Sequence, residues 1–159
     1  MLRQTLLLAC VAAVSSHICL LNPHQRGSME GINKFGAKDC MLRTGPCGGR
    51  PADDPPSLKL ISGTNYTVTF QQNVNHLDPN SPGYFAVSIG DDMDSLVEAA
   101  RIPDRGAPNF TIFQVPILVP LEGASLTHVI QVKYVTNNPS IPVPLGTYYQ
   151  CGDILINDP

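Results

Sequence analysis

The sequence lacks tryptophan and has few charged residues, which make up 14% of the chain. Its 10 Lys and Arg are outnumbered by 13 Asp and Glu, so the formal net charge is −3. No polybasic cluster is present, and we therefore expect neither nucleic acid nor an anionic membrane as a partner. The Gly-x-Ser-x-Gly motif of many hydrolases is also missing.

Long apolar runs are missing as well, apart from the first residues. Residues 1–16 resemble a secretory signal peptide, with Arg3, an apolar run over 6–14, and small side chains at Val14 and Ser16 before a cleavage point. Beyond them we expect no transmembrane segment. The last residues lack the hydrophobic tail of a lipid-anchor signal. We expect a signal peptide over 1–16, a single domain over 17–159, and a secreted, extracellular, soluble protein.

The cysteines are also consistent with secretion. Removal of Cys10 with the signal peptide leaves an even number, Cys19, Cys40, Cys47 and Cys151. In an oxidising compartment these are expected to form two disulfides, whose three alternative pairings remain open. Two Asn-x-Thr motifs also predict glycosylation, at Asn65 and Asn109.

The pattern along the chain predicts an all-β fold. Residues 23–56 are rich in Gly, Pro and charge, which indicates a long N-terminal loop region held by disulfides. Short apolar runs separated by turn residues follow, and they predict strands over 58–60, 66–72, 83–89, 109–115, 128–135 and 147–156. A short helix is expected only over 94–101. The whole pattern is typical of an antiparallel β-sandwich.

The candidate functional residue of most interest is His17, because cleavage after Ser16 would make it the first residue. An N-terminal histidine offers two nitrogens to one metal ion, its α-amine and its ring Nδ1. One more imidazole would complete a set of three nitrogens, which suits Cu(II). The alternative is that cleavage merely happens to precede a histidine.

His76 is the candidate for the second imidazole, because it lies in a turn rich in Asn and Pro between two strong strands. It could equally be a solvated turn histidine, and His24 and His128 are weaker candidates. Asp153 lies in an otherwise apolar strand, where a buried carboxylate needs a partner. That partner is either the metal, which would make Asp153 a fourth ligand, or a Lys or Arg in a salt bridge.

Several motifs together resemble one family. Their order along the chain is His17, Gly45-Pro46-Cys47-Gly48-Gly49, Asn75-His76, Pro82-Gly83-Tyr84 and Tyr149-Gln150-Cys151-Gly152-Asp153-Ile154. This arrangement is similar to that of the copper acquisition factors that look like lytic polysaccharide monooxygenases. The chain departs from the family at Gly152, where the family has Ala, and in lacking a lipid-anchor signal.

The resemblance implies an immunoglobulin-like β-sandwich that binds one Cu(II) per chain. The ligands would be the amine and ring of His17, the ring of His76 and the carboxylate of Asp153. It also implies disulfides Cys47–Cys151 and Cys19–Cys40. Members of this family are regarded as copper-homeostasis proteins, so a copper transporter or another receiving protein at the cell surface would be a partner.

Three functions remain open. The one we expect is copper binding without turnover, because a carboxylate on the metal would occupy the position that oxygen needs and would stabilise Cu(II). The first alternative is a copper-dependent polysaccharide monooxygenase, although the chain has no tryptophan for sugar stacking. The second is a secreted interaction module without metal.

Overall fold

The computed structural model describes residues 17–121, 126–143 and 145–159, so the expected signal peptide lies outside the described residues. The described residues form eight strands and one short 3-10 helix. In chain order these are β1 (His17–Asn22), η1 (Lys38–Cys40), β2 (Leu58–Ile61), β3 (Asn65–Val74), β4 (Tyr84–Gly90), β5 (Val97–Pro103), β6 (Thr111–Leu118), β7 (Leu126–Val135) and β8 (Thr147–Asn157). No helix in this part of the chain is long and apolar enough to cross a membrane.

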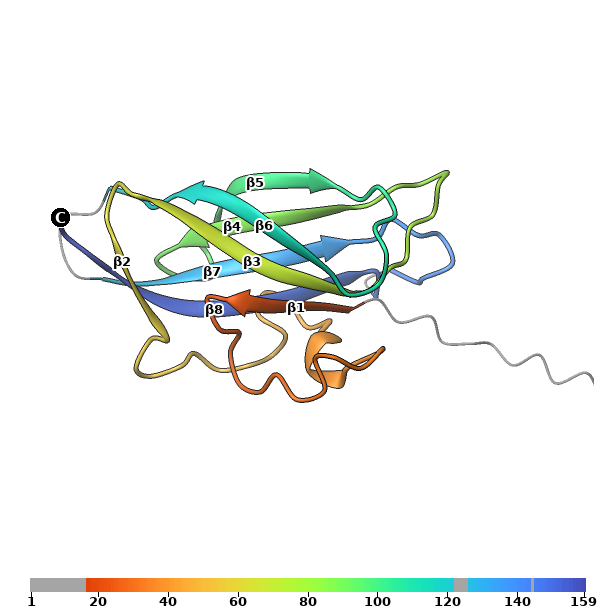
Figure 1. The fold of residues 1–159 in the computed structure, drawn as a ribbon, viewed down its shortest axis with the longest axis horizontal. Helices are drawn as coiled ribbons and strands as arrows, with labels where there is room; N and C mark the ends of the chain where they lie inside the picture. The colour runs from red at the N-terminus through yellow and green to blue at the C-terminus, as the bar shows by residue number, and fades with distance from the viewer. Residues whose placement is uncertain (1–16, 122–125, 144) are drawn as a thin grey trace, which may run out of the picture.

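The strands form two sheets that face each other (Figure 1). One sheet has the order β1-β3-β6, and the other has the order β2-β8-β7-β4-β5. All neighbours are antiparallel except β2 and β8, which run parallel. The predicted all-β sandwich is therefore confirmed, with one parallel pair added at the edge of the larger sheet.

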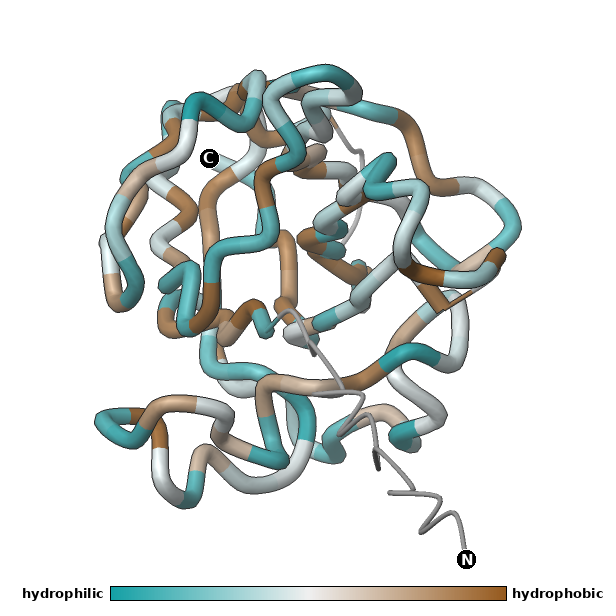
Figure 2. The backbone as a smooth tube through the Cα atoms, turned by 90° about the vertical axis from the view of Figure 1, so that its right-hand side faces the viewer, coloured by the Kyte–Doolittle hydropathy of each residue, from teal (hydrophilic) through white to brown (hydrophobic). Residues whose placement is uncertain are grey.

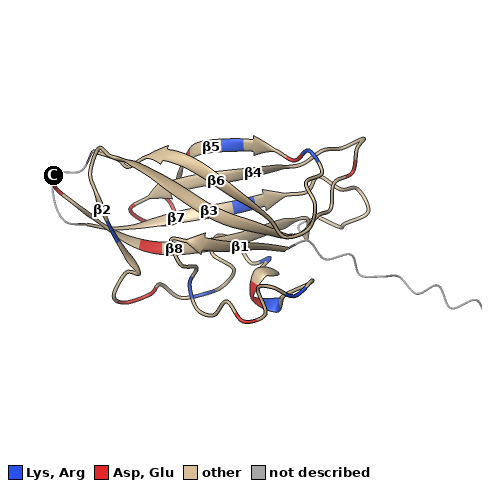
Figure 3. Ribbon diagram, in the orientation of Figure 1, with Lys and Arg blue, Asp and Glu red and all other residues tan. Residues whose placement is uncertain are grey.

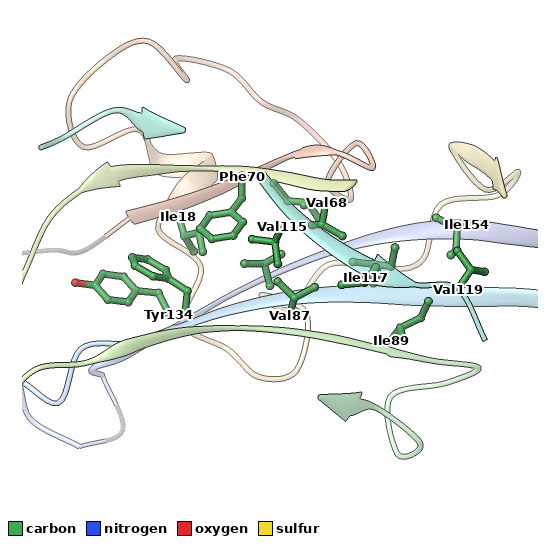
Figure 4. Close-up of a cluster of buried hydrophobic side chains, with 14 of the residues drawn as sticks. Ile18, Val68, Phe70, Val87, Ile89, Val115, Ile117, Val119, Tyr134 and Ile154 are labelled. Atoms are coloured by element: carbon green, nitrogen blue, oxygen red, sulfur yellow. The ribbon is translucent and has the colours of Figure 1, made fainter. Parts of the chain in front are cut away.

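The core lies between the sheets because alternate side chains of each strand point inward. On β3, Val68 and Phe70 are fully buried, and Figure 4 shows them facing Val87 and Tyr134 from the other sheet. The rings of Phe70 and Phe85 lie 5.4 Å apart, which joins the two layers. Burial of such apolar surface is the main force that holds a sandwich together.

The predicted loop region is a third layer. Residues 23–57, which link β1 to β2, run below β1 and β8 in Figure 1 and include η1. Two disulfides fasten the layer, Cys19–Cys40 to β1 and Cys47–Cys151 to β8. Both pairs are those that the family resemblance implied.

Two elements differ from the prediction. The prediction of a helix over 94–101 is wrong, because most of this segment belongs to β5, which pairs with β4. The pairing extends from Tyr84 opposite Pro103 to Ile89 opposite Val97. Pairing with β4 satisfies the backbone groups of this segment, and this outweighs the high helix propensity of its two alanines, Ala99 and Ala100. Strand β1 was not predicted; it forms because Ile18 and Leu20 are buried against the core.

Candidate functional site

His17 is held at one end of the sandwich. It is the first residue of β1 and lies opposite Val74, the last residue of β3. Because Ile18 and Leu20 enter the core, alternation turns the side chain of His17 away from them. The residue is only 1% exposed, and its ring meets the ring of Tyr148 edge-on, with centroids 6.4 Å apart.

His76 follows the end of β3 and is 4% exposed. Its backbone N–H donates to the hydroxyl of Tyr134 at 3.3 Å, and its carbonyl accepts from Asn138 Nδ2 at 3.3 Å. The fold therefore brings His76 to the same end of the sandwich as His17. Figure 2 views the molecule from this end, with the loop region as a separate layer below the sheets.

The electrostatic environment keeps the His17 ring neutral. Its pKa is lowered from 6.5 to about 4, mainly by burial and then by the nearby charges of His76 and Arg43. A metal-binding histidine has to be deprotonated, and His17 meets that condition at neutral pH. His76 is among the groups that act electrostatically on the His17 ring, in agreement with the position of both residues at the same end of the sandwich.

The hydrogen bonding of His17 leaves room for a ligand. Neither Nδ1 nor Nε2 has a hydrogen-bond partner among the described residues, although both atoms are buried. Buried polar atoms normally have a partner, so this arrangement needs an explanation. A metal ion bound to the ring would be such a partner. Imidazole nitrogens are common copper ligands, so the residues present fit copper.

A loop of the third layer covers the His17 ring. A Cβ placed on Gly36, whose φ is +74°, would lie 3.5 Å from Cε1 of His17. The buried side chain of Asn73 fixes this loop through four hydrogen bonds. Its Oδ1 accepts from the N–H groups of Gly36 and Ala37 at 3.0 and 3.2 Å, and its Nδ2 donates to the carbonyls of Ile32 and Lys34, each at 3.0 Å.

Two side chains of this site were not identified from the sequence. Arg43 donates to the hydroxyl of Tyr148 at 3.0 Å, and its guanidinium carbon lies 5.1 Å from the centre of that ring. Together they place a cation and an aromatic edge beside His17. The strand pattern around Tyr148 was visible in the sequence, but nothing in the loop composition singled out Arg43.

Asp153 is not part of this site, which corrects its interpretation as a metal ligand. Its carboxylate pairs with Arg26 at 2.7 Å and accepts the N–H of Asp53 at 2.8 Å. It lies five residues beyond Tyr148 on β8, about 16 Å along an extended strand. Figure 3 shows the acidic position of β8 far from the start of β1.

The two weaker histidine candidates, His24 and His128, do not join His17 and His76. His24 is exposed, with its Nδ1 2.6 Å from the carbonyl of Gln25, and His128 is buried on β7, where it pairs with Ile154. Asn65 and Asn109 are both exposed, so glycosylation of either stays a prediction. In the described residues, no group of three or more His, Cys, Asp or Glu side chains is arranged to hold a metal. A three-nitrogen site therefore needs the α-amine of His17.

Comparison with known proteins supports the fold. No protein-family model matches the chain, and no curated protein matches it. Among solved structures, the chain is similar to a lytic polysaccharide monooxygenase, AA15, from Thermobia domestica in the Cu(I) state. The two share 18% sequence identity with a TM-score of 0.57, over 89% of this chain and 99% of the other. This likeness shows that the chain has the β-sandwich fold of that protein.

Proposed function

We propose that the protein is a secreted copper protein that binds one copper ion through His17 and His76 and acts as a polysaccharide monooxygenase. The observation that carries the proposal is the buried His17 ring, neutral and without a hydrogen-bond partner among the described residues, beside His76. After cleavage before residue 17, the α-amine of His17 would be the third nitrogen. Nitrogen ligands of this kind suit copper.

The position of Asp153 favours an enzyme over a passive binder. A carboxylate bound to the metal would occupy a copper position that oxygen needs and would oppose turnover. Because Asp153 pairs with Arg26, it does not block that position. The similar solved structure is named a lytic polysaccharide monooxygenase, and this is the source of the proposed substrate class.

The protein's own residues would orient and shield the metal. Bound copper supplies one-electron chemistry with oxygen. The edge of Tyr148 and the loop at Gly36 hold the His17 ring in one orientation and keep water from its sides. Arg43 adds a positive charge beside the site, which disfavours extra charge on the metal and so favours Cu(I).

A second candidate is copper acquisition without turnover, with delivery to a copper transporter or another receiving protein at the cell surface. The observation in its favour is burial, since His17 and His76 are only 1% and 4% exposed. An enclosed pair of histidines favours retention of an ion over contact with a large polymer.

Copper affinity of two secreted preparations tests the metal site. One begins at His17, and the other carries one additional residue before it; intact mass verifies each N-terminus and the two disulfides. We expect tight Cu(II) binding by the first and a large loss of affinity in the second. His76→Ala should also lose affinity, whereas the matched control His24→Ala, which changes an exposed histidine, should not.

Product analysis then separates the functions. The copper-loaded protein is incubated with a reductant, oxygen and either chitin or cellulose, and soluble products are examined by mass spectrometry. Oxidised oligosaccharides support the monooxygenase. Tight copper binding without such products from either polymer supports copper acquisition. Equally weak binding by both preparations would show that His17 does not chelate, and the interaction module without metal would replace both proposals.

A further inference from the structure

A chain of hydrogen bonds leads from His76 to a buried carboxylate that the proposed site does not include. The N–H of His76 donates to the hydroxyl of Tyr134 at 3.3 Å. That hydroxyl donates in turn to Oδ2 of Asp104 at 2.5 Å. Tyr134 is fully buried and Asp104 is 3% exposed, so these hydrogen bonds are shielded from water.

Asp104 is itself firmly held. It follows the last residue of β5, its Oδ1 accepts the N–H of Gly106 at 2.9 Å, and its own N–H donates to the carbonyl of Gly83 at 3.0 Å. The ring of Tyr134 stacks on Phe85, with centroids 4.4 Å apart. Neither end of the connection to His76 is therefore free to shift.

Among the described residues, no Lys, Arg or His forms an ion pair with Asp104. The ion pairs within the described part of the chain join Arg26 to Asp153, Arg50 to Asp39, and Arg101 to Glu98. Asp104 is instead stabilised by hydrogen-bond donors, the hydroxyl of Tyr134 and the N–H of Gly106. Burying a carboxylate without a cationic partner costs free energy, which these hydrogen bonds reduce, and the field of the buried charge is weakly screened by salt.

The loop that begins at Asp104 contacts the His76 turn at two further points. Asn75 donates its backbone N–H to Oδ1 of Asn109 at 2.7 Å and its Nδ2 to the carbonyl of Ala107 at 3.0 Å. Residues 104–109 thus hold Asn75, the residue directly before the one that would bind the metal. Outer partners of this kind commonly set the orientation of a metal ligand.

We propose that Asp104 is a positioning residue for His76, acting through the hydroxyl of Tyr134, and that its buried negative charge favours Cu(II) over Cu(I) at the site. The part concerning copper rests on the proposed function. The part concerning position belongs to the protein alone and is testable without metal.

Amide hydrogen exchange in the metal-free protein is the first test. Tyr134→Phe keeps the stacked ring and removes the hydroxyl, and Asp104→Asn keeps an acceptor oxygen and removes the charge. We expect faster exchange of the His76 amide in both variants, at least tenfold in Tyr134→Phe. The matched controls are Tyr66→Phe, near the opposite end of β3, and Asp94→Asn, an exposed carboxylate, neither of which should change it. Unchanged exchange in Tyr134→Phe would overturn the proposal.

Copper measurements test the electrostatic part. We expect Tyr134→Phe to bind Cu(II) about tenfold more weakly and to show an altered electron paramagnetic resonance spectrum. Asp104→Asn should raise the Cu(II)/Cu(I) midpoint potential relative to Asp94→Asn, and equal potentials would refute the role of the charge. If Tyr134→Phe fails to fold, the same measurements are made on Asp104→Asn and Asp104→Glu. Asp104→Glu keeps the negative charge, so its midpoint potential should be close to that of the unaltered protein. If the unaltered protein binds no copper, the proposed function fails, while the exchange result still decides the positioning role.

Discussion

The carboxylate of Asp153 and the guanidinium of Arg26 form a two-pronged ion pair, with hydrogen bonds of 2.7 and 2.9 Å. Both residues are buried, at 0% and 6% exposure. The backbone N–H of Arg26 also donates to the carbonyl of Cys151 at 2.7 Å. This pair therefore joins the loop region to β8 in the same neighbourhood as the Cys47–Cys151 disulfide.

Removing one member of that pair should destabilise the protein strongly. Asp153→Ala leaves the Arg26 charge buried without its partner, and we expect a loss of about 3–5 kcal/mol in unfolding free energy by denaturant titration. Glu98→Ala is the matched control, because it breaks the exposed pair with Arg101 and should change the unfolding free energy far less. A change in copper potential in Asp153→Ala, with the fold intact, would contradict the structural role.

Asn73 should determine the order of the loop over His17. Asn73→Ala removes four hydrogen bonds to the loop backbone, and we expect about 2 kcal/mol or more of lost stability. Hydrogen exchange at the amides of Gly36 and Ala37 should accelerate most. Asn80→Ala, at an exposed turn position, is the control and should leave those amides protected.

The two disulfides should contribute unequally to stability. Cys47–Cys151 spans 104 residues and Cys19–Cys40 spans 21, so the first restricts the unfolded chain more. The chain-entropy relation gives about 4.7 kcal/mol for a loop near 100 residues and about 3 kcal/mol for a short one. Paired Cys→Ala variants compared by thermal unfolding measure both values, and an equal loss from the two would count against this explanation.

The stability of the metal-free protein should fall in mild acid because of His17. Its pKa is lowered from 6.5 to about 4 in the folded state, chiefly by burial. Between these two pH values the unfolded chain binds a proton that the folded chain does not, so folding becomes less favourable as pH falls through this window. His17→Gln should flatten that part of the profile of unfolding free energy against pH, and His24→Gln should leave it unchanged.

Local pattern was enough to predict most strands. Alternation along 66–72 and 147–156 identified β3 and β8 because one face of each strand is buried in the core. The same alternation placed Asp153 on the face of Cys151, which the structure shows turned toward the loop region. The strand within 94–101 could not be predicted in this way, because it forms through pairing with β4, which is a tertiary interaction.

The sequence by itself determined the all-β class, the loop region and the identity of the two histidines of the candidate site. These are local properties, set by residue type and spacing. Only the tertiary structure decided that Arg26, and not a metal, neutralises Asp153, and that Arg43, Tyr148 and the Tyr134–Asp104 pair surround the histidines. Those partners lie up to 127 residues apart in the chain, and only the packing of the sheets and loops brings them within hydrogen-bond distance.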